Sequence, residues 1–280
     1  MWGGGWLAQL GTTFGLGGGM IDAGGSAVIQ ATGGLTALAI ACLLGPRRGK
    51  YGTDGMATAI PGHNIVLVLF GCILALVGWT GLNAAGAMIF YAVTPGRVVL
   101  VVLNTMLAAG AAAIAALTVT RFRFGKPDAS LTANGWVAGL VASSAGCAFV
   151  SPGDAIFIGL VAGGVVPFAV EFFELKLYVD DPGGAISVHA GAGLWGTLAA
   201  GLFAFAAPGM RGPQILAQLV GVATLVGFVL PVAYGLNWLL HRLMSQRVDR
   251  DGDYQGMDVR ELGAGAYPEF VVHSDEFVPR

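Results

Sequence analysis

Long apolar runs, separated by short polar stretches rich in Gly and Pro, dominate the pattern of this chain. A helix that rises about 1.5 Å per residue needs roughly 20 apolar residues to cross a hydrocarbon core of about 30 Å. Several runs approach or exceed that length, and they are too numerous for the core of one soluble domain. They predict seven membrane-spanning helices, near residues 25–44, 64–88, 98–120, 133–150, 155–173, 185–205 and 215–243.

The composition fits a tightly packed bundle in lipid. Hydrophobic residues make up 55% of the chain and charged residues 11%, whereas a soluble domain carries roughly 25% charged residues. Glycine accounts for 46 of the 280 residues, and small residues let membrane helices approach closely. We therefore expect an all-α, polytopic membrane helix bundle. The net charge of −2 gives no reason to expect a nucleic-acid partner.

The distribution of Lys and Arg sets a direction across the membrane, because cytoplasmic loops carry the excess of positive charge. If residues 45–63 are cytoplasmic, every Lys and Arg except Arg97 and Arg211 falls on that side. The amino terminus is then outside. The pattern predicts a membrane domain over residues 1–243 and a polar cytoplasmic tail over residues 244–280.

Two segments far apart in the sequence share one pattern. Asp22-Ala-Gly-Gly-Ser-Ala-Val-Ile-Gln30-Ala-Thr-Gly-Gly34 aligns with Asp181-Pro-Gly-Gly-Ala-Ile-Ser-Val-His189-Ala-Gly-Ala-Gly193. By the charge rule the first segment enters the membrane from outside and the second from the cytoplasm. This is the arrangement of an inverted-topology repeat, which is typical of transporters.

In each copy an acid is followed eight residues later by a hydrogen-bonding side chain, Gln30 or His189, which a continuous helix would place about 12 Å deeper. We predict that these two side chains meet near mid-membrane. Polar groups at that depth are costly unless they face a cavity or a partner, which favours a functional role over simple joining of two helices. For Asp22 and Asp181 the favoured interpretation is capping of free backbone N–H groups.

The chain resembles the ammonium transporter and Rhesus-protein family. The resemblance rests on Trp-Gly-Gly-Gly-Trp at residues 2–6, on the Asp22 segment, and on Gly78-Trp-Thr-Gly-Leu-Asn-Ala84. Further matches are Asn104-Thr105, Asn134-Gly-Trp-Val-Ala-Gly-Leu-Val141, Asp180-Asp-Pro182 ahead of His189, and the tail segments Gly256-Met-Asp258 and Ala266-Tyr-Pro-Glu269. These matches follow the order of the family over nearly the whole chain.

The resemblance implies a trimer of eleven-helix subunits, each with its own narrow hydrophobic pore between two five-helix inverted repeats. The seven predicted helices match the last seven of the family, so we expect the inverted-repeat fold lacking the first four helices. Trp2 would then lie at the outer end of the fourth helix. On this view the chain is a fragment, the product of a wrongly assigned start, or half of a split transporter.

The resemblance also assigns residues to a substrate pathway. The position of Trp2 attracts the cation at the outer end through its aromatic face. Trp79 and Asn83 match the family, whereas Leu82 stands at the position of a pore-gating phenylalanine. Gly86 stands where many members have a serine that helps to bind the cation. We expect a gate that is wider and less aromatic than usual.

Deeper in the pore, family members usually have two hydrogen-bonded histidines. His189 matches the second, and Gln30 replaces the first. Imidazole exchanges a proton near neutral pH, whereas an amide does not titrate. We predict that deprotonation of the cation and return of its proton are impaired or rerouted. Asp22, Asp180 and Asp181 are expected to support the structure.

The predicted function is transport of ammonium or ammonia across the plasma membrane, through one pore per subunit of a homotrimer. We expect no enzymatic activity, no catalytic residue, no cofactor and no metal, because the sequence contains no nucleophile–base pair, phosphate loop or metal-ligand cluster. The expected partners are the lipid bilayer and a regulatory protein at the tail. Two alternatives stay open: an ammonium sensor that signals through the tail, and a non-conducting partial subunit.

Overall fold

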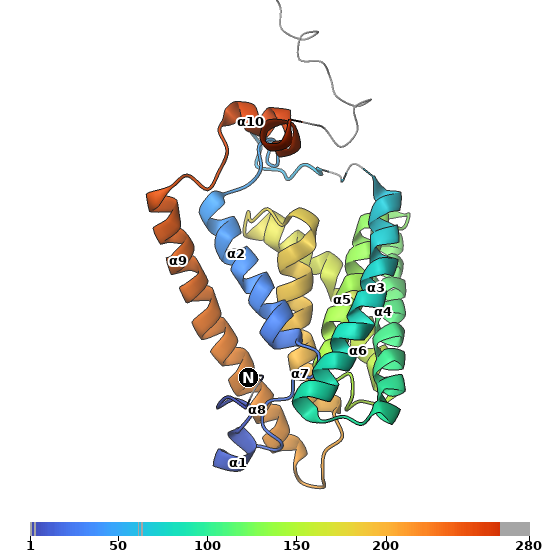
Figure 1. Ribbon diagram of the computed structural model, residues 1–280. Helices are drawn as coiled ribbons and strands as arrows, with labels where there is room; N and C mark the ends of the chain where they lie inside the picture. Colours follow the sequence, from blue (N-terminus) through green and yellow to red (C-terminus); the bar gives the residue numbers. More distant parts are fainter. Residues whose placement is uncertain (1, 3, 61, 63, 264–280) are drawn as a thin grey trace, which may run out of the picture. The chain divides into compact units, whose positions relative to one another are not determined.

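The computed structural model describes residues 2, 4–60, 62 and 64–263, and within these every regular element is helical (Figure 1). The all-α prediction is confirmed. The chain divides into two compact units, residues 1–237 and 238–280. In chain order the elements up to the second unit are α1 (Leu10–Phe14), η1 (Ser26–Ala31), α2 (Thr32–Leu44), α3 (Ile65–Tyr91), α4 (Pro95–Phe124), α5 (Ala129–Ser144), α6 (Pro152–Glu171), η2 (Phe172–Lys176), η3 (Pro182–Gly184), η4 (Ala185–Ala192), α7 (Gly193–Phe203), α8 (Arg211–Thr224), η5 (Leu225–Val229) and α9 (Leu230–Leu243).

Six helical segments of the described chain are long and apolar enough to cross a membrane: Ser26–Leu44, Ile65–Tyr91, Pro95–Phe124, Pro152–Lys176, Pro182–Phe203 and Arg211–Leu243. The predicted span at residues 133–150 is not among these six, and the number of spans stays a prediction. Its helix, α5, has 16 residues, which rise only about 24 Å. Residues 145–149 form turns. Apolarity alone did not reveal this break, because the turn is built from Ala, Gly, Cys and Phe.

α4 packs against α5 and α6, and small residues make the contact. A Cβ atom on Gly139 of α5 would lie 2.3 Å from the carbonyl oxygen of Ala108 on α4. One on Gly159 of α6 would lie 2.2 Å from the same oxygen. Real Cβ atoms do not approach so closely, so these positions require glycine. The close packing expected from the glycine content is confirmed here.

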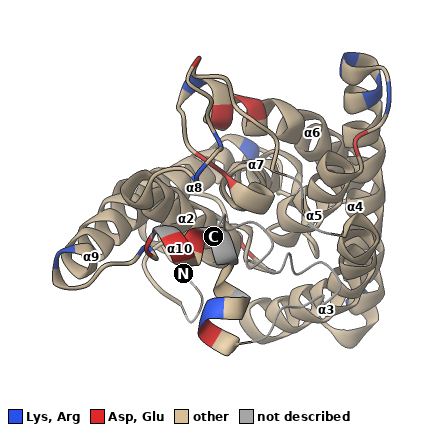
Figure 2. Cartoon of the chain, turned by 90° about the horizontal axis from the view of Figure 1, so that it is seen from above, with Lys and Arg blue, Asp and Glu red and all other residues tan. Residues whose placement is uncertain are grey.

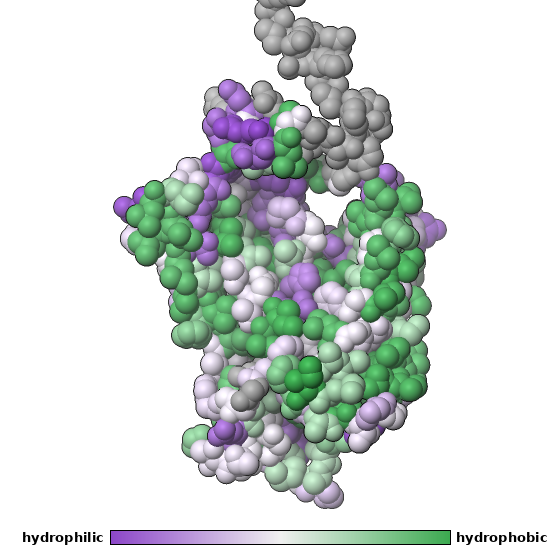
Figure 3. All heavy atoms as spheres, in the orientation of Figure 1, coloured by the Kyte–Doolittle hydropathy of each residue, from purple (hydrophilic) through white to green (hydrophobic). Residues whose placement is uncertain are grey.

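The flanks of the first unit are apolar. α3 exposes Val66, Phe70, Ile73, Leu74 and Val77, and hydrophobic residues cover large areas of the face drawn in Figure 3. Lys, Arg, Asp and Glu lie mainly on loops and near helix ends (Figure 2). Such a surface suits lipid, because a soluble protein rarely exposes contiguous apolar areas of this extent.

The second unit contains the end of α9, then α10 (Arg250–Gln255) and η6 (Asp258–Leu262). Asp249 caps α10 by accepting the N–H of Gly252 at 2.9 Å, and it also forms an ion pair with Arg260. The family-like tail segment at residues 266–269 lies outside the described residues. A tail beginning at residue 244 stays a prediction.

Candidate functional site

The segment that leads to Gln30 starts with a buried acid. The two carboxylate oxygens of Asp22 accept the backbone N–H groups of Ala27 at 3.1 Å and Val28 at 2.9 Å. Gly25, with φ +90°, turns the chain into η1 through a conformation that side chains rarely adopt. We call η1 with α2 the Gln30 half-helix, and η4 with α7 the His189 half-helix. Asp22 caps the Gln30 half-helix from a position four residues before its first residue, Ser26.

The segment that leads to His189 repeats this construction. Asp181 accepts the N–H groups of Ile186 and Ser187, each at 2.8 Å, and the Ser187 hydroxyl at 2.8 Å. The two N–H groups lie five and six residues after the acid, as they do after Asp22. Gly184, with φ +74°, takes the place of Gly25. The repeated pattern is one three-dimensional motif used twice, and the capping interpretation of both acids is confirmed.

The predicted depth of the polar residues needs correction. Residues 22–25 are not helical, and Gly183 within η3 is also non-helical. The eight residues from Asp22 to Gln30 therefore do not form one continuous helix, and the estimate of about 12 Å, which assumes one, does not apply. Both half-helices begin with π-helical turns, η1 and η4. Such turns are rare and occur frequently at functional sites.

The two half-helices cross where glycines face backbone. A Cβ on Gly34 would lie 2.1 Å from the backbone nitrogen of Ala190, and one on Gly193 would lie 2.9 Å from the backbone nitrogen of Ala31. In the repeat alignment Gly34 corresponds to Gly193, and Ala31 corresponds to Ala190. The contact of Gly34 with Ala190 is therefore equivalent to the contact of Gly193 with Ala31, as expected for two inverted segments.

The crossing brings Gln30 and His189 into contact. Nδ1 of His189 lies 2.7 Å from Oε1 of Gln30, so the predicted meeting of these side chains is confirmed. An amide oxygen only accepts hydrogen bonds, and with this amide orientation Nδ1 of His189 donates. The neutral imidazole then keeps a lone pair on Nε2. Gln30 is buried and His189 is half-buried.

Trp79 of α3 lies next to this pair. The ring of Trp79 lies roughly parallel to the ring of His189, with centroids 6.5 Å apart and planes at 22°. The Trp79 indole N–H donates to Oγ of Ser144 at 2.9 Å, which fixes the ring. Leu82 follows three residues later, on the same side of the helix, and is half-buried.

Trp2 and Gly86 contact the entrance segment of the Gln30 half-helix, which is the non-helical stretch of residues 22–25. The indole N–H of Trp2 donates to the carbonyl oxygen of Asp22 at 2.8 Å, and its ring stacks on Phe90 of α3 with centroids 4.3 Å apart. A Cβ on Gly86 would lie 2.2 Å from the carbonyl oxygen of Ala23. A serine at this position would therefore require the entrance segment to move.

Asn83 occupies packed interior. It is fully buried, and its Nδ2 donates to Oγ1 of Thr105 on α4 at 2.9 Å. Its Oδ1 lies so close to Gly24 that a Cβ there would be 2.0 Å away. Asn83 of α3 thus faces α4 and the residues 22–25 that precede η1. Its place along a substrate pathway stays a prediction.

Comparison with known proteins decides the family. Residues 1–267 match the sequence model described as Ammonium Transporter Family. The chain belongs to this family. It is 38% identical over 292 residues to Ammonium transporter Amt2 of Archaeoglobus fulgidus, and the match covers 99% of this chain and 62% of that protein. It is 32% identical over 287 residues to Ammonium transporter Amt1 of Haloferax mediterranei, covering 98% and 54%.

Two solved structures have a similar fold. One described as Sensor Amt Protein superposes with a TM-score of 0.83 at 33% identity, covering 92% of this chain and 62% of that chain. Mep2 of Saccharomyces cerevisiae superposes with a TM-score of 0.73 at 24% identity, covering 85% and 55%, which shows likeness of fold alone. The chain thus spans 54% to 62% of the lengths of these four relatives.

Four polar residues hold the segments that precede the two capping acids, and the sequence analysis did not predict this role. Arg47 and Lys50 were considered only for orientation, and Gln214 and Gln218 were not considered. Each makes a hydrogen bond or an ion pair near one of the two capping acids. For the glutamines a signal existed, because two amides spaced i, i+4 in an apolar span indicate one polar stripe.

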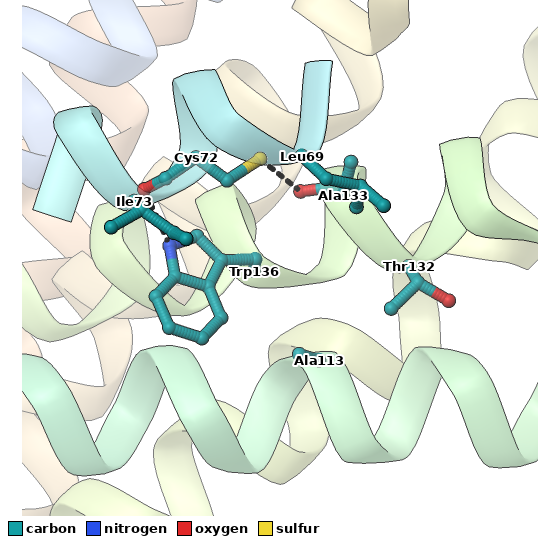
Figure 4. Close-up of a pocket in the computed structure, with 7 residues that line it drawn as sticks. All are labelled: Leu69, Cys72, Ile73, Ala113, Thr132, Ala133 and Trp136. Atoms are coloured by element: carbon teal, nitrogen blue, oxygen red, sulfur yellow. Dashed lines mark hydrogen bonds between the residues drawn. The ribbon is translucent and has the colours of Figure 1, made fainter. Parts of the chain in front are cut away.

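A cavity of about 220 Å³ lies between α3, α4 and α5 of this family member (Figure 4). Inside it the Trp136 indole N–H donates to the carbonyl oxygen of Cys72 at 3.0 Å, and the Cys72 thiol contacts the carbonyl oxygen of Ala133 at 4.0 Å. The lining is otherwise almost wholly apolar, with Leu69, Ile73, Ala113 and Thr132. It includes none of the predicted pathway residues, so this cavity is separate from the Gln30–His189 pair.

Proposed function

We propose that this chain forms part of a pore through which ammonium or ammonia crosses the plasma membrane down its gradient. The observation that carries the proposal is the 2.7 Å contact between Gln30 and His189 where two antiparallel half-helices cross. Ionisable side chains such as His189 are rare within membrane-spanning helices and usually mark solute pathways. Membership of the family supplies the class of solute.

The hydrogen-bonding pattern suits a small nitrogen or oxygen donor. His189 donates from Nδ1 and keeps a lone pair on Nε2, which accepts an N–H of ammonia or an O–H of water. Gln30 does not titrate, so a proton taken from ammonium has no second imidazole to move to. The pair therefore orients the solute without relaying a proton. Deprotonation of the cation is impaired or rerouted relative to a pore with two histidines.

Trp2 supplies the attraction for the cation at the outer end. An aromatic face contributes roughly 0.5–2 kcal/mol to cation binding, which is weak enough for release. The hydrogen bond from its indole N–H to the Asp22 carbonyl supports this role, because it restrains the ring. Beyond this point, dry apolar walls including Trp79 and Leu82 disfavour hydrated metal cations.

The distribution of charge supports the proposed orientation in the membrane, and membership of the family supports the proposed assembly. The excess of Lys and Arg in the loops at residues 45–63 and 121–132 supports an amino terminus outside and a cytoplasmic tail. We propose a homotrimer with one pore per subunit and a regulatory protein at the tail. The four helices that the resemblance expects before residue 1 stay a prediction.

A sensor is the second candidate function. The contact of Gly86 with the Ala23 carbonyl excludes a serine hydroxyl that would bind the cation, which weakens the chemistry of conduction. One structural relative is described as Sensor Amt Protein. In this alternative, binding near Trp2 is reported through the tail. A non-conducting partial subunit is the third candidate.

Uptake of methylammonium into liposomes that contain the 280-residue chain separates these candidates. A pore gives uptake above that of protein-free liposomes, and His189→Ala lowers it at least about tenfold, or about 1.4 kcal/mol in the barrier. The control Gly33→Ala keeps uptake unchanged, because a Cβ at Gly33 meets nothing within 4 Å. A sensor binds methylammonium without uptake, and a partial subunit shows neither.

Currents on a solid-supported membrane then test Gln30. Gln30→His provides a second imidazole next to His189, so we expect larger currents after an ammonium pulse at neutral pH. Equal currents for the two proteins would contradict the role assigned to Gln30.

A further inference from the structure

Polar side chains link the two half-helices near their ends. Each group of linking contacts, called a tie below, includes the residue directly before a capping acid. Asp180 precedes Asp181, which caps the His189 half-helix. Ile21 precedes Asp22, which caps the Gln30 half-helix. Asp180 is contacted by a side chain that follows the Gln30 half-helix in the chain, and Ile21 by one that follows the His189 half-helix.

The cytoplasmic tie is ionic. Oδ2 of Asp180 accepts the backbone N–H of Arg47 at 2.9 Å and its Nε–H at 2.7 Å, while Oδ1 accepts Nη2–H at 2.9 Å. This fork of parallel hydrogen bonds fixes both position and orientation. Arg47 follows the last residue of α2, Leu44, by three positions. The carboxyl end of the Gln30 helix is thus joined to the start of the His189 helix.

Lys50 strengthens this tie from the same loop. Its side chain is only 4% exposed, and its Nζ lies 2.7 Å from Glu174 Oε1 and 3.9 Å from Asp180 Oδ1. The Tyr51 hydroxyl donates to the carbonyl oxygen of Glu174 at 3.0 Å. Two cations and two anions therefore meet, and the loop after α2 is held against the chain before Asp181 at several points.

The outer tie is formed at Ile21, which corresponds to Asp180 in the repeat alignment, but its contacts are made by neutral amides. Gln218 of α8 accepts the N–H of Ile21 at 2.8 Å and donates to the carbonyl oxygens of Ile21 at 2.8 Å and Thr197 at 2.7 Å. Thr197 belongs to α7, the continuation of the His189 half-helix. Gln214, one turn earlier, accepts the N–H of Gly18 at 2.9 Å and donates to the carbonyl oxygen of Gly19 at 2.8 Å.

We propose that Arg47 is a positioning residue for His189. Asp180 and Asp181 are adjacent, so a shift of Asp180 moves the carboxylate that holds the N–H groups of Ile186 and Ser187. These residues lie three and two positions before His189, in its own helical turn. Arg47 therefore sets how far His189 projects toward Gln30 and keeps the Nδ1 to Oε1 contact at hydrogen-bond length. The consequence for transport rests on the proposed function, whereas the consequence for the imidazole does not.

The test measures the His189 ring directly, in the full chain in lipid nanodiscs with ¹⁵N-labelled histidine. The His189 signals are identified by their loss in His189→Asn. In the unchanged protein we expect a neutral ring with a hydrogen-bonded, protonated Nδ1. Arg47→Gln should lose this signature, and Arg47→Lys should weaken it, because an ammonium keeps the charge without the fork. Lys126→Gln, the matched control, removes one charge from another loop and should leave the signature unchanged.

The outcomes separate positioning from general damage and from the proposed function. A His189 signature in folded Arg47→Gln equal to that of Lys126→Gln overturns the proposal. If Arg47→Gln does not fold, Arg47→Lys decides: a changed signature supports the proposal and an unchanged one overturns it. In liposomes we expect the maximal rate of methylammonium uptake to fall about tenfold in Arg47→Lys with unchanged KM. If the unchanged protein shows no uptake, the proposed function fails, and the ring signature still decides the role of Arg47.

Discussion

The two half-helix entrances are built alike in their backbone and differ in what they offer a solute. In each, an acid accepts two N–H groups at the same offsets, a glycine with positive φ starts a π-helical turn, and a second glycine meets the opposite backbone. They differ at the eighth residue after the acid, which is Gln30 in one and His189 in the other. They also differ in the tie before the acid, which is made by neutral amides before Asp22 and by charged side chains before Asp181. The crossing therefore depends on backbone contacts, and its chemistry depends on one side chain from each half.

The largest expected effect comes from breaking the crossing itself. Gly34→Ala would place a Cβ 2.1 Å from the backbone nitrogen of Ala190. Backbone cannot yield as a side chain does, so we expect a loss of about 3 kcal/mol in the free energy of unfolding. Thermal unfolding in detergent measures this. The adjacent Gly33→Ala should be neutral or slightly stabilising, because it gains helix propensity without a clash. Equal melting temperatures for the two variants would contradict the crossing.

The caps should differ in strength although their geometry is alike. Asp181 accepts three hydrogen bonds and Asp22 accepts two from the corresponding N–H groups. Hydrogen bonds to a charged group contribute about 1.5–3 kcal/mol each when a partner is removed. We expect Asp181→Ala to lower the free energy of unfolding by about 1.5–3 kcal/mol more than Asp22→Ala, because it loses one more such bond. A larger loss for Asp22→Ala in the same melting assay would show that the extra hydroxyl contributes nothing.

The neutral and ionic ties should respond differently to salt. Gln214→Met removes two neutral hydrogen bonds to the segment before Asp22, and we expect a loss of about 1–2 kcal/mol. This loss should be the same at low and high salt. Arg47→Met should cost less at high salt, because screening already weakens its partly exposed ion pair in the unchanged protein. Parallel salt responses of the two variants would argue against an ionic tie at Asp180.

The smallest effect is the pH dependence of the ionic tie. Burial alone raises the pKa of Asp180, but hydrogen bonds from Arg47 and the charges of Arg47 and Lys50 outweigh it, so the pKa lies below its ordinary value. The ionised carboxylate therefore adds stability that is complete above the unfolded pKa of about 3.9 and is lost as the pH falls through the lower folded value. We expect a loss below about pH 4 of no more than about 1 kcal/mol, since Arg47 is partly exposed.

Melting curves between neutral pH and about pH 3 check this sign. Asp180→Asn has no charge to lose at this position, so its stability should fall less on acidification than that of the unchanged protein. A steeper fall in Asp180→Asn would mean that the pKa of Asp180 is not lowered by its cationic partners.

The meeting of Gln30 with His189 could be predicted from sequence, because the two aligned segments carry the same spacing from an acid and enter from opposite sides. Their depth could not, since the break between each acid and its helix depends on the positive φ of Gly25 and Gly184. Hydropathy does not report φ. The sequence also predicts a span over residues 133–150 that includes the turn after α5, because the residues of that turn are mostly apolar.

The sequence by itself determined the helical membrane class, the family and the equivalence of the two entrances, because these follow from composition and from spacing within short segments. Only the tertiary structure decided the partners of the buried polar groups. Arg47 and Asp180 are 133 residues apart in the chain, and Ile21 and Gln218 are 197 apart. Such contacts depend on how closely two backbones approach, and at Gly34 and Gly193 that distance is set by the absence of a side chain.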